Sequence, residues 1–391
     1  MSTTTAGIIA EFNPFHNGHS THISETRQIT GCKHVIAVMS GNFVQRGEPA
    51  ICNKWQRTRM ALLNGVDVVI EIPVQYVISG ADYFARGSVG LLNAAGVIDA
   101  LCFGSESGSL QEIIAAGHVL AEEPALYKQV LRDKLDKGAS FAAAKGAALG
   151  ACLGEVDEGL LTRPNNGLAM EYCKTLRLLN SPMGVFTTHR QQGGPSATKI
   201  RQSLLAGQDI GECVPQNVKN ILQNIPKFAQ LDDFSDIFRY LLYTKTDAVN
   251  SLAEGLGNRF RRLCSDFSTI SGLLGAVKTK RYTYTRLQRD VLKIILDILP
   301  QDMDTFDRHG GVQYIRVLGF RKEAAGIVGE MSRNASLPVI TNGAAMDELL
   351  QTDGLGAKML SQELMAGDIY RLISGESGGY CSERGAGIII V

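Results

Sequence analysis

Short apolar runs alternate with segments of helical period between residues 6 and 123. The apolar runs are AGIIAEF, HVIAVMS, VDVVIEIP and DALCFGSE, and each precedes a segment in which apolar residues recur with helical spacing. Strands that alternate with helices pair in parallel, because each helix carries the chain back across the sheet. The sequence therefore predicts an α/β fold with a doubly wound parallel sheet.

The same alternation continues once more before the pattern changes. GVFTTHR followed by SATKIRQSLLAG forms another strand and helix unit, after an Ala-rich helical stretch. Beyond it most segments have helical period, and QYIRVLGF and SLPVITN are the few strand candidates. We expect an α/β domain over residues 1–205, with a helical insertion around 125–180, and a largely helical domain over 206–391.

Composition excludes several classes of protein. The 39 Lys and Arg residues balance 39 Asp and Glu residues, so a nucleic-acid or membrane partner would have to meet a local patch. The eight cysteines include no CxxC pair, which indicates structural thiols rather than a zinc site or a disulfide framework. No apolar run reaches about 18 residues. We expect a soluble cytoplasmic protein without membrane contact, and nothing points to an obligate protein partner.

The segment AEFNPFHNGHSTH follows the first predicted strand and holds three of the seven histidines. Ligands of open α/β sheets bind beyond the carboxyl ends of the strands. Asn13-Pro14 predicts an extended turn, Gly18 allows a ligand to approach the backbone, and the start of the next helix attracts anions. His16 and His19 should share one side of the first helical turn, where they can donate hydrogen bonds to phosphate oxygens.

Other interpretations of these histidines are open. An isolated HxxH is more often a pair of helix caps or partly buried side chains, and we interpret His22 in this way. Metal ligation by His16 and His19 lacks a carboxylate or thiol at a ligand-like spacing, so we expect no metal site formed by the protein.

A second motif favours a functional interpretation of His16 and His19. HNGH after a first strand resembles the HIGH signature of the nucleotidyltransferase superfamily, and SATKIR, residues 196–201, resembles its partner signature. In that element hydroxyl and cationic side chains near a helix start hold the triphosphate. Two signatures in the right order, each at a strand-to-helix junction, favour a nucleotide site.

The resemblance extends over most of the chain. GIIAEFNPFHNGH, MSGNFVQRGEPA, SGADYFARG, FGSESG, RPNNGLAMEY, SATKIR and KRYTYTRLQR together resemble the bacterial tRNA(Met) cytidine acetate ligase family. The resemblance implies that ATP activates acetate as acetyl-adenylate, with Mg²⁺ as the companion of the triphosphate. The acetyl group then passes to N4 of the wobble cytidine, position 34, of elongator tRNA(Met), and AMP and pyrophosphate are released.

The resemblance also assigns residues. His16, His19, Lys199 and Arg201 become the catalytic residues, with the two histidines at the phosphates of ATP. The other residues that it places against ATP are Gly7, Ile8, Ile9, Ala10, Glu11, Phe12, Asn13, Pro14, Phe15, Asn17, Gly18, Ser20, Gly104, Asn165, His189, Arg190, Ser196 and Thr198.

Binding of tRNA is expected from a basic stretch in the second half of the chain. Basic and aromatic residues interleave there, as phosphate contact and base stacking require, although a solvated helix face would also be basic. The basic residues are Lys278, Lys280, Arg281, Arg286 and Arg289, with Tyr282 and Tyr284 between them and Arg316 and Arg321 further along. Only the resemblance favours contact with RNA over a solvated helix face as the role of these basic residues.

Three further residues have no assigned role. Gln45, Arg46 and Glu48 lie in the loop GNFVQRGEPA beyond the second predicted strand. Two other functions remain open: an adenylyltransferase that builds a small-molecule cofactor, which needs no basic patch, and an RNA-binding protein with a vestigial nucleotide site. The intact HNGH and SATKIR motifs argue against the second.

Overall fold

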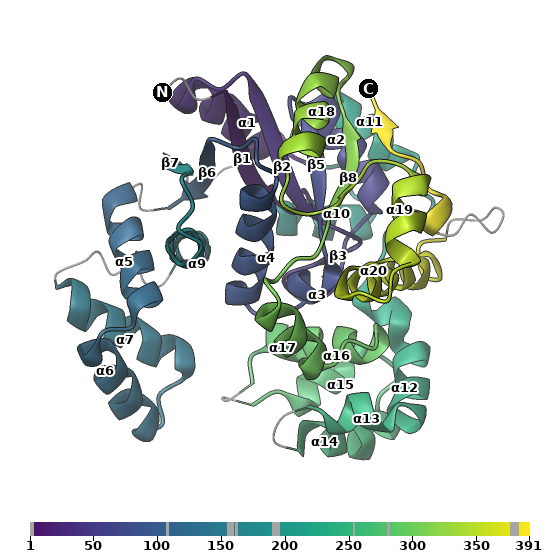
Figure 1. Ribbon diagram of the computed structural model, residues 1–391. Coiled ribbons are helices and arrows are strands. Elements are labelled where there is room, and N and C mark those ends of the chain that lie inside the picture. Colours follow the sequence, from purple (N-terminus) through teal and green to yellow (C-terminus); the bar gives the residue numbers. More distant parts are fainter. Residues whose placement is uncertain are drawn as a thin grey trace.

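The computed structural model describes residues 4–106, 109–154, 160, 163–189, 196–252, 255–279, 282–375 and 383–391. One eight-stranded sheet forms its centre, in the order β10-β8-β5-β2-β1-β6-β7, with β9 paired to β8 (Figure 1). The strands are β1 (Thr5–Ala10), β2 (His34–Ser40), β5 (Val68–Ile72), β6 (Ala100–Ser105), β7 (Gly184–His189), β8 (Ile315–Phe320), β9 (Val339–Ile340) and β10 (Ile389–Ile390).

The five strands from the first half of the chain pair in parallel, which confirms the doubly wound α/β prediction. Alternate residues of β2 enter two different cores: Val35, Ala37 and Met39 face one, and Ile36 and Val38 face the other. A strand that is buried on both faces has no polar positions, which explains its continuous apolar run.

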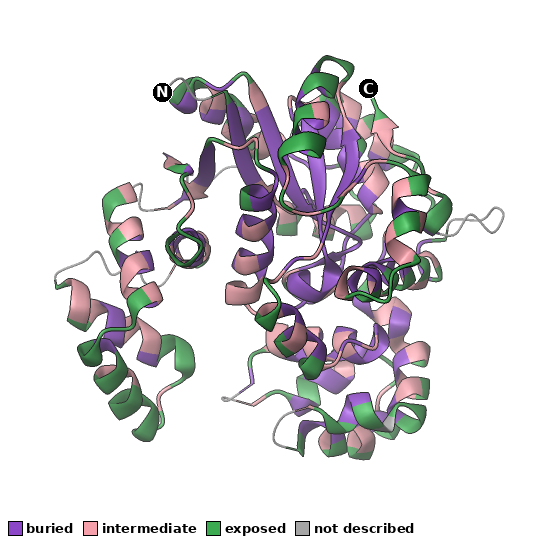
Figure 2. Cartoon of the chain, viewed as in Figure 1, coloured by how far each residue is buried: buried purple, intermediate pink, exposed green. Residues whose placement is uncertain are grey.

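Helices cover both faces of the sheet. The first face is covered by α1 (Asn17–Thr30), α2 (Lys54–Leu63), α10 (Ala197–Leu205) and α11 (Gln216–Gln223), whose apolar residues share a core with β1 and β2. The second face is covered mainly by α4 (Ala81–Ala94), which follows the short α3 (Val74–Val77). The strands β1, β2, β5, β6 and β8 are accordingly buried along most of their length, whereas β7 at the sheet edge is mostly half-buried or exposed (Figure 2).

The predicted helical insertion is present as an arm beyond the β7 edge of the sheet (Figure 1). Its helices are α5 (Leu110–Glu122), α6 (Ala125–Asp136), α7 (Phe141–Leu153) and α9 (Pro164–Leu178). Gly117 lets α5 approach α9 closely, because a Cβ atom there would lie 2.5 Å from Cys173 Cβ.

The second half of the chain is mostly helical, as expected. Its helices are α12 (Ser235–Thr244), α13 (Thr246–Asn250), α14 (Leu256–Leu263), α15 (Ile270–Val277), α16 (Tyr284–Ile295), α17 (Pro300–Arg308), α18 (Ala325–Asn334), α19 (Gly343–Leu350) and α20 (Leu355–Arg371), with short 3₁₀ turns η1 (Leu231–Phe234), η3 (Cys264–Asp266), η4 (Lys322–Ala324) and η5 (Glu383–Gly385). Within the described ranges, none of the helices is long and apolar enough to cross a membrane.

This half is not separate from the first. Both strand candidates, as β8 and β9, join the sheet of the α/β part together with β10, and β8 pairs antiparallel with β5. The sheet therefore continues across the expected boundary near residue 205. Pairing with β8 covers the edge that β5 would otherwise expose.

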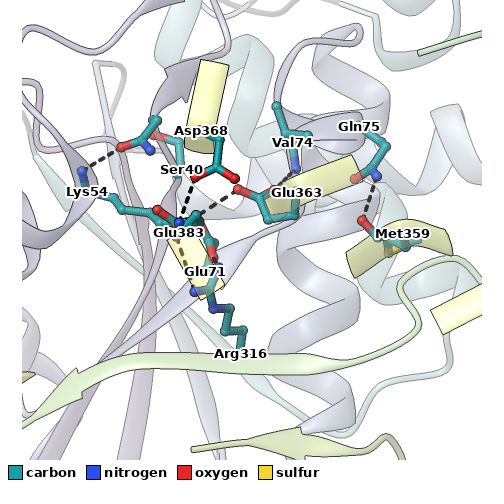
Figure 3. Close-up of polar contacts among 12 residues, drawn as sticks. Ser40, Lys54, Glu71, Val74, Gln75, Arg316, Met359, Glu363, Asp368 and Glu383 are labelled. Carbon is teal, nitrogen blue, oxygen red and sulfur yellow. Dashed lines mark hydrogen bonds and ion pairs between the residues drawn. The ribbon is translucent and has the colours of Figure 1, made fainter. Parts of the chain in front are cut away.

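Five charged side chains form a fully buried cluster between the two halves (Figure 3). Lys54 Nζ lies 2.5 Å from Glu71 Oε1, 2.5 Å from Glu383 Oε1 and 3.5 Å from Glu363 Oε1. Arg316 Nη1 lies 3.0 Å from Glu71 Oε2, and its Nη2 lies 3.2 Å from Glu383 Oε1. Arg316 is only 2% exposed, so its expected place in a basic RNA patch is wrong.

Two carboxyl groups of this buried cluster have pKa values shifted in opposite directions. Burial and the neighbouring Glu71 carboxylate raise the pKa of Glu363 to about 8. Burial alone would also raise the pKa of Glu71, but Lys54 and Arg316 lower it below its ordinary value. Near neutral pH, Glu363 is therefore neutral, and Glu71 is the ionised carboxylate that faces Lys54 and Arg316.

Candidate active site

The loop that follows β1 is fixed by its aromatic side chains. Phe12 and Phe15 are at most 1% exposed, with ring centroids 5.1 Å apart, and Phe12 has a φ of 46°. Asn13 Oδ1 accepts a hydrogen bond of 2.8 Å from the Ile51 amide. The side chains hold the loop to the core, so its backbone lies at the carboxyl end of the sheet, as predicted.

His16 and His19 lie together at the start of α1, which confirms that they share one side of the first turn. Their rings stack with centroids 3.7 Å apart. The Gly18 amide donates to His16 Nδ1 at 3.1 Å, and the His16 amide donates to His19 Nδ1 at 3.1 Å. Because both Nδ1 atoms accept, the proton of each neutral ring is assigned to Nε2, which can donate to a phosphate oxygen.

Gly18 has a packing role that the sequence analysis did not foresee. A Cβ atom at this position would lie 2.9 Å from His16 Cε1 and 3.0 Å from His16 Nδ1. Any side chain would therefore displace the His16 ring. The glycine of HNGH thus sets the position of the first histidine.

The SATKIR segment meets this loop directly. Ser196 is the N-cap of α10, and its Oγ accepts from the Lys199 amide at 3.4 Å. Arg201 Nη1 donates to the Asn13 carbonyl at 2.8 Å. Thr198 and Lys199 are exposed, whereas burial lowers the pKa of Arg201. The two motifs, far apart in sequence, therefore form one site.

Glu11 connects a third segment to the site. Its Oε1 accepts from the Gln45 amide at 2.7 Å, and its carbonyl accepts from Arg57 Nη1 at 2.6 Å. Burial raises the pKa of Glu11, although the Gln45 amide and the charges of Arg201, Arg57 and Arg46 oppose this. The QRGE loop, whose role sequence could not assign, thus borders the β1 loop.

Arg57 is a residue that sequence reasoning missed. It is fully buried, and its guanidinium also donates to the Ser40 carbonyl at 3.1 Å, the Cys52 carbonyl at 3.2 Å and the Gly41 carbonyl. Three segments around the site are therefore held by one cation. Its neighbours on the buried side of α2 include Lys54 and Thr58, so no apolar period distinguished Arg57 in the sequence.

The ends of β6 and β7 form the opposite border. Gly104 pairs in register with Thr188, and the exposed His189 ends β7. Among the described residues, a Cβ atom at Gly104 would meet only Thr188 Oγ1, at 3.8 Å, so packing does not require glycine here. His22 Nδ1 lies 2.8 Å from Thr188 Oγ1, which joins α1 to β7 and agrees with a structural role.

Asn165 lies at the start of α9 and contacts a carboxylate that the sequence did not single out. Asn165 Nδ2 donates to Glu106 Oε1 at 2.7 Å, and the Asn166 amide donates to Glu106 Oε2 at 3.2 Å. Arg163 Nη1 donates to the Glu106 carbonyl at 3.1 Å. Glu106 therefore orients Asn165 from the segment that follows β6.

Several residues of the expected ATP loop serve the core. A Cβ atom at Gly7 would lie 2.6 Å from Leu92 Cδ2, so this glycine admits α4. Ile8, Phe12, Pro14 and Phe15 are buried, and could reach a ligand only through their backbone. The others of this loop are half-buried, namely Ile9, Ala10, Asn17 and Ser20. Arg190 lies outside the described residues.

The donor set at this site suits an anion. Within the described part of the chain, no group of three or more His, Cys, Asp or Glu side chains could hold a metal ion. Imidazole and guanidinium N–H groups bind phosphate oxygens, and a magnesium ion prefers oxygen ligands. A magnesium ion at this site would therefore be held largely by phosphate oxygens. The seven described cysteines are free.

The expected tRNA patch is only partly described. Lys280 and Arg281 lie outside the described residues, and Lys278 is exposed after α15. Tyr282 is 8% exposed and belongs to the core, with the Arg286 guanidinium 4.9 Å from its ring centroid. The prediction that this ring stacks on a base is therefore wrong, because the ring is covered.

The patch is joined to the site through the hairpin of β3 (Phe43–Val44) and β4 (Glu48–Pro49). Arg289 Nη1 donates to the Gln45 carbonyl at 3.3 Å, and Gln288 Nε2 donates to Glu48 Oε1 at 2.9 Å. Gly47 has a φ of 83°, and a Cβ atom there would lie 2.5 Å from the Arg289 amide nitrogen. Helix α16 therefore packs directly on the loop that contacts Glu11.

Comparison with known proteins identifies the family. A family model described as HIGH Nucleotidyl Transferase matches residues 3–381. The tRNA(Met) cytidine acetate ligase of Thermoanaerobacter sp. (strain X514) is 38% identical over 94% of each chain, and that of Clostridium kluyveri (strain ATCC 8527 / DSM 555 / NBRC 12016 / NCIMB 10680 / K1) is 38% identical over 86% of this chain and 88% of its own.

Solved structures agree with these relatives. The crystal structure of Thermotoga maritima TmcAL bound with alpha-thio ATP is 30% identical, with a TM-score of 0.93 over 99% of both chains. Its apo form has a TM-score of 0.91 over 98% of this chain and 97% of its own, also at 30% identity. The chain therefore belongs to the tRNA(Met) cytidine acetate ligase family of HIGH nucleotidyl transferases.

Proposed function

We propose that this protein is an ATP-dependent ligase that activates acetate as acetyl-adenylate and acetylates N4 of the wobble cytidine of elongator tRNA(Met). One observation carries the assignment to this chain: Arg201 donates to the Asn13 carbonyl at 2.8 Å, and so brings the SATKIR helix to the stacked His16 and His19. The two motifs of an adenylating site thus lie together, and we assign the substrates from the family to which the chain belongs.

In the first step an acetate oxygen attacks the α-phosphorus of ATP, and the bond from that phosphorus to the bridging oxygen of pyrophosphate breaks. Negative charge grows on the leaving pyrophosphate. The Nε2–H groups of His16 and His19 and the cations of Lys199 and Arg201 are placed to stabilise this charge. Magnesium would accompany the triphosphate and neutralise part of its charge.

In the second step the N4 amine of cytidine attacks the carbonyl carbon of acetyl-adenylate, and AMP leaves. The oxygen that joined acetate to phosphorus departs with AMP, and the amine loses a proton. The chain's part in this step is to hold the two reactants in contact, which alone lowers the barrier substantially.

Exchange of labelled pyrophosphate into ATP tests the first step without tRNA. We expect exchange that requires acetate. Exchange that requires a different small-molecule acceptor would support the cofactor adenylyltransferase instead. An absence of any ATP turnover, in protein that binds tRNA, would support the RNA-binding alternative and contradict our proposal.

Lys199 and Arg201 should affect different kinetic constants. Lys199 is exposed in the first turn of α10, so we expect its contact with pyrophosphate to form mainly in the transition state, whereas Arg201 is already held against Asn13. Lys199→Ala should lower kcat by about 10- to 100-fold with little change in KM for ATP, because it removes a contact made mainly in the transition state. Arg201→Ala should raise KM as well as lower kcat.

Initial rates of exchange at varied ATP concentration measure both constants. Lys134→Ala, which removes an exposed lysine on α6, is a matched control and should leave both unchanged. If Lys199→Ala instead acts chiefly on KM, the lysine binds ATP in the ground state and our assignment fails.

A further inference from the structure

A cavity lies against α16, and no residue of the β1 loop is among the residues that line it. It has a volume of about 320 Å³ and is bordered by the segment before α4 and by residues next to α13 and α17. Its polar wall consists of Arg286, Arg289, Asp290 and Lys293, and its apolar wall includes Leu252 and Ile298. The four charged residues recur at helical spacing, so they share one face of α16.

The polar wall carries an excess of positive charge. Asp290 is the one acidic residue that lines the cavity among the described residues, and its Oδ2 lies 4.0 Å from Arg286 Nε. Lys293 forms no ion pair with any described residue. Burial lowers the pKa of Arg289 and of Lys293, because it removes their charged forms from water, although Asp290 opposes this. An anion in the cavity would offset the free-energy cost of burying these two cations.

The shape and chemistry of the cavity fit one nucleotide unit. Its volume is in the range of small-ligand sites, and exceeds what a phosphate group alone would fill. A phosphate could bind the cations of α16 while a ribose or base packs on Leu252 and Ile298. Nucleotides splayed out of single-stranded RNA loops are bound in this way, by cations and apolar surfaces together.

The cavity is also connected to the active site. Arg289 borders the cavity and donates to the Gln45 carbonyl at 3.3 Å, while the Gln45 amide donates to Glu11 at 2.7 Å. RNA bound here would therefore lie against the hairpin that borders the nucleotide loop. A free phosphate would gain nothing from that connection.

We propose that this cavity binds one nucleotide of the tRNA substrate, with its phosphate at Arg286, Arg289 and Lys293; the proposal rests on the function proposed above. Lys293 then becomes a tRNA-binding residue that the basic sequence stretch did not include. Asp290 lowers the affinity of the site, because its carboxylate repels the phosphate.

Two substitutions with opposite expected effects on tRNA affinity test the proposal. Lys293→Gln should weaken binding of tRNA(Met) by about 5- to 10-fold and reduce the slope of log Kd against log salt by about one, because one phosphate contact is lost. Asp290→Asn should tighten binding. Lys134→Gln on α6 serves as the control and should bind like the wild type. Fluorescence anisotropy of labelled tRNA at several salt concentrations measures all four proteins.

The outcomes separate the two proposals. If the wild type binds tRNA and neither substitution changes its affinity, the cavity is not an RNA site. If both substitutions weaken binding equally, they act through the fold and the proposal is also wrong. Binding of inorganic phosphate, detected by calorimetry and lost in Lys293→Gln while tRNA affinity is unchanged, would assign the cavity to a free anion. A wild type that binds no tRNA would overturn the proposed function itself.

Discussion

Replacing His16 or His19 with alanine is expected to lower acetate-dependent pyrophosphate exchange by about two to three orders of magnitude, the scale of losing one preorganised donor to a developing oxyanion. Both rings are held by backbone contacts to Nδ1 and by mutual stacking at 3.7 Å, so their Nε2–H groups need no rearrangement during the reaction. Steady-state exchange rates at saturating acetate and ATP measure the loss.

A second substitution separates chemistry from helix capping. His16→Asn supplies an Oδ1 that can accept from the Gly18 amide, so it keeps the N-cap but removes Nε2–H. We expect it to remain folded and to be as impaired as His16→Ala. His22→Ala, in the same helix, is the matched control and should retain most activity. Wild-type rates in His16→Asn would show that His16 only caps α1.

Glu71→Gln is expected to destabilise the protein by about 3–5 kcal/mol, because it leaves Lys54 and Arg316 buried with too little negative charge. Glu363→Gln should be far milder near neutral pH, since the glutamine resembles the protonated carboxyl and can still accept from the Val74 amide. Urea unfolding followed by circular dichroism compares the two variants. Equal losses would contradict the protonation states that we assign to Glu71 and Glu363.

The same pair predicts how stability depends on pH. The pKa of Glu363 is raised from 4.5 to about 8 in the folded state, so between these values the folded state holds a proton that the unfolded state has lost. Stability from this group is complete below pH 4.5 and is lost as the pH rises through 8. Wild type should therefore lose stability relative to Glu363→Gln between pH 4.5 and about 8, and the difference should level off at higher pH. A constant difference would rule out a neutral Glu363.

The parallel sheet formed by the first strands could be predicted from sequence, because burial on both faces leaves long apolar runs that alternate with helical segments. The addition of β8 to β5 could not, since short apolar segments carry no information about their partners. Glu71 within VVIEI and Arg316 within IRVLGF did carry a signal, because a charge inside a buried strand requires an opposite charge. Their pairing across 245 residues was beyond sequence reasoning.

In the active site, too, some features could be predicted from the sequence and others could not. The placement of His16 and His19 on one side of α1 followed from helical spacing, but their stacking did not. The resemblance of HNGH and SATKIR to paired signatures implied that both segments hold the triphosphate. The contact of Arg201 with a backbone carbonyl could not be predicted. Every residue has a carbonyl, so the sequence does not indicate which one a side chain contacts. The same holds for Gly18, whose hydrogen atom makes room for the His16 ring rather than for a ligand. Glu106 was quoted within FGSESG, but its contact with Asn165 depends on the fold.

The central claim is that acetate attacks the α-phosphorus of ATP in this site and is then transferred to tRNA. Acetate labelled with oxygen-18 tests it in one reaction with ATP and elongator tRNA(Met), analysed by mass spectrometry. We predict AMP that carries one labelled oxygen, in an amount equal to the N4-acetylcytidine formed. Unlabelled AMP, or ADP with labelled phosphate, would show that acetate is activated elsewhere and would contradict the account.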